Sequence, residues 1–166
     1  MPKRKKAKIL ILGVGNVLRR DDGFGVAALE YIRTRYDVPE DVLLFDGGAG
    51  GIALTSIIGE HKKIIILDAV SAGSLPGAMH RITKTHIGKT RGKTLSPHGF
   101  GVEEALTLTD FEGRNPDDLT LIGVEPLDTT SGLELSALLK LRLPIAAEMV
   151  RTELKRHGVI MKAFPR

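Results

Sequence analysis

The sequence predicts an α/β protein, a three-layer α/β/α sandwich around a mostly parallel sheet of about five strands. Short uninterrupted aliphatic runs recur along the chain, as at Ile9–Leu12 and Ile64–Leu67. Runs of this length suit strands that are buried on both faces. Stretches with apolar residues at helical spacing alternate with them, as at Gly23–Tyr36. Alternating strands and helices of this kind are typical of a parallel sheet covered by helices.

Each expected element follows from its own local pattern. The first strand, Ile9–Leu12, runs into Gly13 and Gly15, which allow a sharp turn and a close approach to the backbone. Pro144 suits the first turn of a last helix, and Gly158 suits its C-terminal end. The other expected elements are a helix at 23–36, a strand at 42–45, a short helix at 52–58, strands at 64–67, 78–83 and 119–124, and a helix at 102–108. The pattern assigns no element to 125–143, and 86–95 is expected to be a loop.

Composition limits the classes of function. The chain has 166 residues, which predicts one domain at 8–166, and a net charge of +4, much of it from a basic tail at 1–7. No apolar run reaches the roughly 20 residues that span a bilayer, and aromatic residues are only 4%, without a nucleic-acid recognition module. The sequence has no cysteine, which excludes a thiol nucleophile. We therefore expect a cytoplasmic monomer that binds neither membrane nor nucleic acid.

Acidic and imidazole side chains gather at the carboxyl ends of the expected strands, where ligands bind in open α/β sheets. Asp22 and His98 lie in glycine-containing loops, and Asp68 directly follows a strand. Two carboxylates and one imidazole can hold a divalent metal and leave coordination positions open. Asp46 also ends an expected strand. From local sequence alone, however, Asp21 and Asp22 are equally suited to capping a helix, and Asp46 to a turn.

Several other sites are disfavoured. Gly13 and Gly15 lack the third glycine of a dinucleotide fingerprint, because the matching position is Leu18. Walker A, HExxH and GxSxG motifs are absent from the sequence. Ser71 and Ser96 do not lie on elbow-like turns. The remaining histidines are expected on the surface: His61, His80, His86 and His157.

Five segments resemble the maturation endopeptidases of [NiFe] hydrogenases in order and spacing. They are G-V-G-N-V-L-R-R-D-D-G-F-G, D-G-G-A-G-G, I-I-I-L-D-A-V-S-A-G, S-P-H-G-F-G and L-T-L-I-G-V-E-P. The resemblance covers most of the chain from Lys8 to Gly158. It implies an enzyme that removes a short C-terminal peptide from the precursor of the hydrogenase large subunit after nickel insertion.

The resemblance also implies roles for individual residues. Asp22, Asp68 and His98 occupy the catalytic, metal-binding positions. Many relatives have Glu where this chain has Asp22, a carboxylate one methylene shorter. The positions that resemble the substrate-binding ones are Asn16, Asp21, Asp46, Gly47 and Gly48. The nickel would arrive with the precursor, so that only a nickel-loaded precursor docks productively. Either Asp21 or Asp22 could serve as a base toward an attacking water.

Two other functions remain open at this point. A non-catalytic nickel-binding accessory protein of hydrogenase assembly would use the same ligands but leave the precursor intact. A nucleotide-binding α/β module would also fit the fold, although the missing third glycine counts against it.

Overall fold

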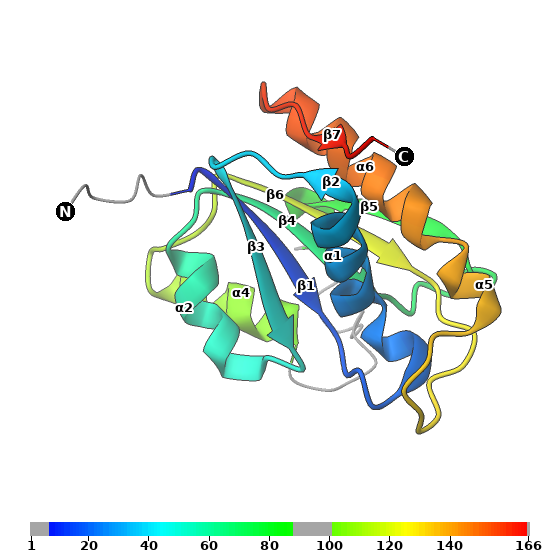
Figure 1. The fold of residues 1–166 in the computed structure, drawn as a ribbon. Coiled ribbons are helices and arrows are strands. Elements are labelled where there is room, and N and C mark those ends of the chain that lie inside the picture. The colour runs from blue at the N-terminus through cyan, green and yellow to red at the C-terminus, as the bar shows by residue number, and fades with distance from the viewer. Residues whose placement is uncertain (1–6, 88–100, 166) are drawn as a thin grey trace.

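The main sheet has a mixed, mostly parallel arrangement. The computed structural model describes residues 7–87 and 101–165. In this part of the chain five strands lie in the order β3-β1-β4-β6-β5, of which the first four are parallel and β5 is antiparallel to β6 (Figure 1). Their bounds are β1 Ile9–Val14, β3 Val42–Gly48, β4 Lys63–Ala69, β5 Met79–Thr83 and β6 Asp118–Val124.

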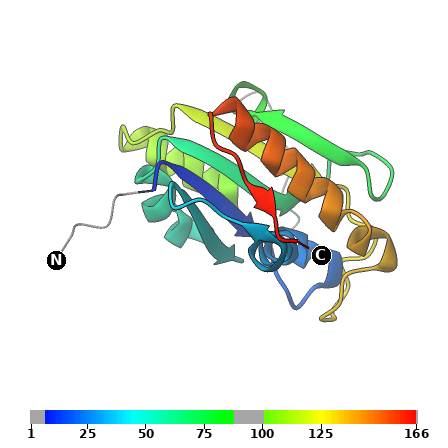
Figure 2. The same cartoon turned by 45° about the horizontal axis from the view of Figure 1, so that its top comes forward.

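Helices cover both faces of this sheet (Figures 1 and 2). The short 3-10 helix η1 leads into α1, and η2 leads into α2. A second sheet pairs the two-residue strands β2 and β7. The bounds are η1 Arg20–Gly23, α1 Phe24–Arg35, β2 Tyr36–Asp37, η2 Gly51–Ala53, α2 Leu54–Gly59, α3 Lys84–Ile87, α4 Val102–Phe111, α5 Ala137–Lys140, α6 Leu143–Arg156 and β7 Lys162–Ala163.

Alternation along the strands builds two separate cores. In β1, Ile9 and Ile11 face the cluster that contains buried residues of α1 and α6. Leu10 and Leu12 face the opposite cluster, which contains buried residues of α2 and α4. Because successive side chains of a strand point to opposite faces, an all-aliphatic strand is buried on both sides. The predicted α/β/α sandwich with a mostly parallel sheet of five strands is thus confirmed.

Helix α6 is fastened to the sheet by a buried carboxylate. Glu153 is only 2% exposed, and Arg81 of β5 donates hydrogen bonds to both of its oxygens, at 2.5 and 3.2 Å. Arg156 adds a third, at 2.8 Å. Burial by itself raises the pKa of Glu153, but the hydrogen bond from Arg81 and the charges of Arg81 and Arg156 outweigh it, so the pKa lies below its ordinary value.

The structure corrects several local predictions. The strands run further than the aliphatic runs, so that Asp46–Gly48 belong to β3 and Asp68 belongs to β4 rather than following it. Both extensions continue the pairing with their neighbouring strands. His61, expected on the surface, is buried, and its Nδ1 lies 2.9 Å from the carbonyl oxygen of Ile57. Across the described ranges no helix is long and apolar enough to cross a membrane.

Candidate functional site

Glycines bring the start of α1 tightly against the carboxyl ends of two central strands. Gly15 has φ +136°, and a Cβ there would lie 1.9 Å from the carbonyl oxygen of Asp22. A Cβ on Gly25 would lie 2.0 Å from the carbonyl oxygen of Leu67 and 2.3 Å from that of Val14. Only glycine permits these backbone approaches. The turn after β1 is therefore built to hold η1 directly over the ends of β1 and β4.

This packing brings two predicted metal ligands to one edge of the sheet. Asp22 lies in η1 and is 0% exposed, and Asp68 lies near the end of β4 and is 2% exposed. Elements η1 and β4 are in contact, and Leu67, against which Gly25 packs, immediately precedes Asp68. Burial of a carboxylate is costly unless a positive charge, hydrogen bonds or a metal ion compensates it. Two carboxylates buried here suit a cation.

Asp21, adjacent to Asp22, makes a dense set of internal hydrogen bonds. Its Oδ2 accepts from the backbone nitrogens of Leu127 and Asp128, at 3.0 and 2.9 Å, and from the hydroxyl of Ser136, at 2.9 Å. Its Oδ1 accepts from the backbone nitrogen of Ser136 at 2.7 Å. Asp21 is 0% exposed. The carboxylate therefore ties η1 to the segment between β6 and α5.

The other predicted substrate-binding residues lie at the same edge. Asp46 is exposed and pairs in register with Gly13 of β1. Its Oδ1 accepts a hydrogen bond from the nitrogen of Gly48, at 2.8 Å, which holds the carboxylate over the strand end. The carbonyl oxygen of Gly48 accepts in turn from Gly15 nitrogen, at 2.8 Å. Asn16 is half-buried and caps the next turn by accepting from Leu18 nitrogen, at 3.0 Å.

The third predicted ligand, His98, lies outside the described residues. Among residues 7–87 and 101–165, no three histidine, cysteine or acidic side chains come together as a group that could hold a metal ion. Of the three predicted metal ligands, the described residues therefore contain two, Asp22 and Asp68.

A further acid at this edge was not singled out from the sequence. Glu125 directly follows β6 and is 8% exposed. Its Oε2 accepts from the backbone nitrogens of Ala72 and Ser74, at 3.0 and 3.3 Å, and lies 3.6 Å from Nε2 of His80. The carboxylate therefore orders the turn after β4. An acid immediately after an aliphatic strand was the signal that could have identified it, as it did for Asp68.

Comparison with known proteins assigns the chain to a class. Residues 26–153 match the family HycI, hydrogenase maturation protease. The hydrogenase expression/formation protein HupD of Rhizobium leguminosarum bv. viciae is 38% identical over 160 residues, covering 95% of this chain and 79% of that protein. The hydrogenase 2 maturation protease of Escherichia coli is 34% identical over 160 residues, covering 96% of each.

A solved structure agrees with these sequence matches. The hydrogenase maturating endopeptidase HybD from E. coli superposes with a TM-score of 0.87 at 32% identity, over 94% of this chain and 97% of that one. These similarities define a peptidase of hydrogenase maturation. The chain belongs to the hydrogenase maturation protease family. The alternatives of a non-catalytic accessory protein and a nucleotide-binding module find no support among these relatives.

Proposed function

We propose that this endopeptidase removes the C-terminal peptide from the nickel-loaded precursor of a [NiFe] hydrogenase large subunit. The observation that carries the proposal is the pair of buried carboxylates, Asp22 and Asp68, held at one edge of the sheet by η1 and β4. The exposed Asp46 and the adjacent glycines of β3 lie at the same edge, where a peptide can reach them. Family membership supports the choice of substrate.

In this proposal the nickel is part of the substrate. Asp22 and Asp68, together with His98, would complete its coordination shell, since imidazole and carboxylate are suitable nickel ligands. Held by these residues, a divalent cation would supply Lewis-acid chemistry toward a carbonyl or a water molecule. A precursor without nickel would bring no cation to these two buried carboxylates and would lose that attraction, so the same two residues would favour the nickel-loaded form.

The placement of the two adjacent acids separates their proposed roles. Each oxygen of Asp21 already accepts hydrogen bonds from the 127–136 segment, which favours a positioning role over substrate contact or proton transfer. Asp22 is therefore the better candidate base toward an attacking water. A water nucleophile is favoured because the sequence contains no cysteine.

The proposal is tested with purified precursor, with and without nickel, and mass spectrometry of its C-terminus. Wild-type enzyme is expected to shorten only the nickel-loaded form. Asp68→Asn keeps the side-chain shape but removes the charge, and His98→Ala removes a ligand, so both should lose cleavage. Asp117→Asn, whose side chain is 74% exposed, is the matched control and should cleave normally. Normal cleavage by both site variants would refute the assignment.

The expected location and oligomeric state complete the proposal. One copy of the chain carries every proposed site residue, which supports a monomer. A cytoplasmic location remains part of the proposal. Multi-angle light scattering on the purified protein and fractionation of cells that express it would test these two statements.

A further inference from the structure

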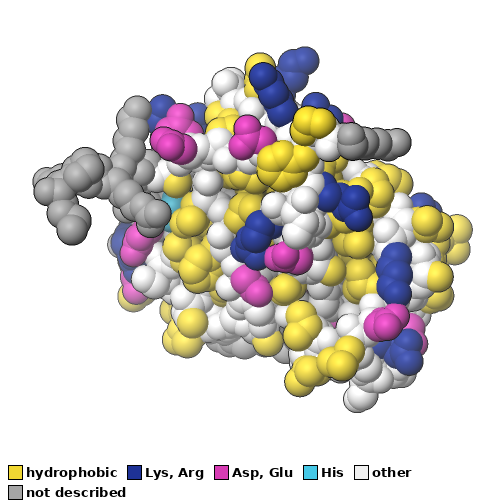
Figure 3. Space-filling model, viewed as in Figure 1, with side chains coloured by type: hydrophobic (Ala, Val, Ile, Leu, Met, Phe, Trp, Pro, Cys, Tyr) yellow, Lys and Arg dark blue, Asp and Glu magenta, His cyan; other side chains and the backbone are white. Residues whose placement is uncertain are grey.

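Exposed aliphatic side chains gather on two loops beside the site. They are Val17 and Leu18, 47% and 61% exposed, and Leu127 and Leu133, 55% and 79% exposed. The loop that precedes η1 carries the first two, and the loop between β6 and α5 carries the others. Figure 1 shows these two loops side by side at the lower end of the molecule, and Figure 3 shows hydrophobic side chains on that end. We call these four side chains the rim patch.

Hydrogen bonds between the two loops give the rim patch a fixed shape. The nitrogen of Gly132 donates to the carbonyl oxygen of Leu18, and Arg20 nitrogen donates to the carbonyl oxygen of Gly132, each at 2.9 Å. Leu127 nitrogen donates to the carboxylate of Asp21. Two of the four apolar residues thus have backbone atoms in the connection itself. A surface that is already ordered loses less entropy on binding than a flexible one.

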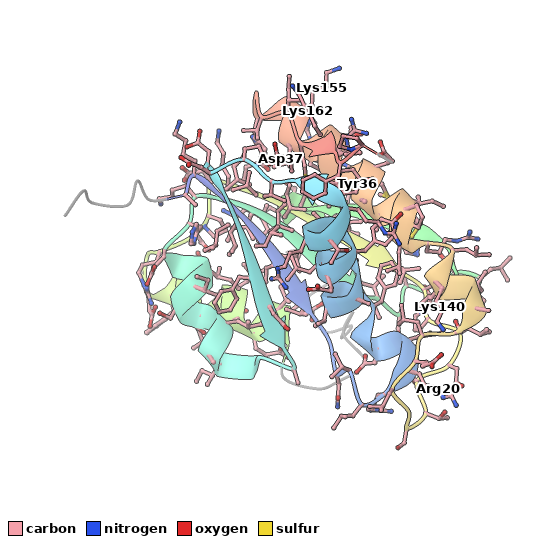
Figure 4. All side chains as sticks on the ribbon, viewed as in Figure 1. Arg20, Tyr36, Asp37, Lys140, Lys155 and Lys162 are labelled. Carbon is pink, nitrogen blue, oxygen red and sulfur yellow. The ribbon has the colours of Figure 1, made fainter. Side chains whose placement is uncertain are left out.

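The charges beside the rim patch largely compensate each other. Arg20 Nε lies 3.4 Å from Asp128 Oδ2, and Figure 4 labels Arg20 at this end of the molecule. Lys140 donates to Glu134 at 2.7 Å. Arg19 donates to the carbonyl oxygen of Thr129 and adds one positive charge to these two pairs. A net charge this small gives no strong field to select a nucleic acid or a highly charged peptide. An apolar protein surface is the partner that it fits.

We propose that the rim patch docks an apolar surface on the folded body of the precursor while its C-terminal segment enters the site. This inference rests on the proposed function. Leu18 lies four residues before Asp22, and Leu127 lies two residues after Glu125, so a precursor whose cleavage point reaches the strand ends brings its body against these loops.

The size of the rim patch favours this transient partner over a second copy of the chain. Standard stable interfaces bury about 800 Å² per partner, and obligate dimers bury more. Four partly exposed aliphatic side chains supply only a fraction of that area. A small, rigid, apolar contact suits an enzyme that must release its product after each cleavage.

Charge insertion tests the proposal. The double variant Leu18→Lys and Leu133→Lys would place two ammonium groups against the apolar surface of the precursor. Burial of an ammonium group without a counter-charge or a hydrogen-bond acceptor is unfavourable. We expect KM for nickel-loaded precursor to rise about tenfold or more, with kcat within about twofold. The matched control is Phe111→Lys with Ile160→Lys. These side chains are 91% and 67% exposed on segments away from the two loops, add the same charge and should leave both constants unchanged.

The outcomes distinguish a failure of the docking surface from a failure of the proposed function. If the wild-type enzyme cleaves and the folded lysine variant has the same KM, the docking surface is overturned and the proposed function stays intact. Failure of wild-type enzyme to cleave refutes the proposed function, and calorimetric binding of the precursor to wild type and variant then decides the rim patch. If the lysine variant does not fold, Leu18→Ser with Leu133→Ser replaces it. A wild-type dimer that the variant dissociates, with KM unchanged, overturns the proposal in favour of self-association.

Discussion

Removal of the Asp21 carboxylate should destabilise the protein and disturb the site together. Asp21 is 0% exposed and accepts four hydrogen bonds from the segment 127–136, three of them from backbone nitrogens. Two substitutions of different severity probe it. Asp21→Asn keeps the shape but replaces one acceptor oxygen by a donor, whereas Asp21→Ala removes every acceptor.

The magnitude follows from the number of donors left without a partner. In Asp21→Asn the least costly orientation keeps the oxygen at Oδ2, which accepts three bonds, and turns the amide nitrogen toward Ser136 nitrogen. The Ser136 N–H then loses its acceptor and the new amide group faces it as a second buried donor, at a combined cost of about 2 to 4 kcal/mol. Asp21→Ala leaves four donors without an acceptor. Because water can enter and bind some of them, we expect a loss of about 3 to 5 kcal/mol in the free energy of unfolding.

Urea unfolding followed by far-UV circular dichroism measures this loss. With a slope of about 2 kcal/mol per molar urea, a 2 kcal/mol loss lowers the midpoint by about 1 M. Ser136→Ala removes only the hydroxyl that donates a hydrogen bond to Asp21 and caps α5. This variant should cost about 1 kcal/mol. Asp117→Asn is the surface control. A midpoint for Asp21→Ala equal to that of wild type would show that these hydrogen bonds do not hold the loop, and the positioning role would be abandoned.

Further variants test the packing around the site. Glu153→Gln should cost about 2 kcal/mol, because Arg81 loses a charged, buried partner, while Glu134→Gln, with its side chain 80% exposed, should have no measurable effect on the unfolding midpoint. Folding lowers the pKa of Glu153, so the stabilisation by this carboxylate is complete above the ordinary glutamate pKa and is lost as pH falls through the folded value. The urea midpoints of wild type and Glu153→Gln should therefore converge in acid. Midpoints that diverge in acid would contradict this. Gly25→Ala should cost about 1 to 3 kcal/mol and impair cleavage, because its Cβ would meet two backbone carbonyls. Gly59→Ala, whose Cβ would meet only the flexible Arg114 side chain, is the control.

The sequence predicted those parts of the fold that local patterns specify. Aliphatic runs marked the four parallel strands, and their alternation with amphipathic stretches indicated the layered sheet. The ends of β3 and β4 were placed too early, because Asp46 and Asp68 do not look like strand residues. What keeps them in the strands is pairing with β1 and β6, a long-range property that local composition does not carry.

The segment 125–143 had no assignment for a similar reason. It contains the four-residue helix α5 and otherwise little regular structure. Its conformation is set by hydrogen bonds to Asp21, more than one hundred residues earlier. The pairing of β2 with β7 involves two residues on each side, too few for any periodic signal. At the candidate site, the resemblance gave Asp22 a metal-binding position and Asp21 a substrate-binding one, but the sequence could not say which of the two is the base.

The short helix η1 accounts for that division. A 3-10 helix has about three residues per turn, so the side chains of adjacent residues point about 120° apart. Asp21 faces the segment after β6, where its oxygens accept their hydrogen bonds, while Asp22 is directed elsewhere in a helix that also contacts β4. Two consecutive carboxylates therefore have different roles. Asp21 fixes the loop that carries half of the rim patch, and Asp22 lies with Asp68 at the strand ends. A change at Asp21 should accordingly alter both the docking of a precursor and the geometry of Asp22, so its effect on cleavage should exceed that of the two rim lysines.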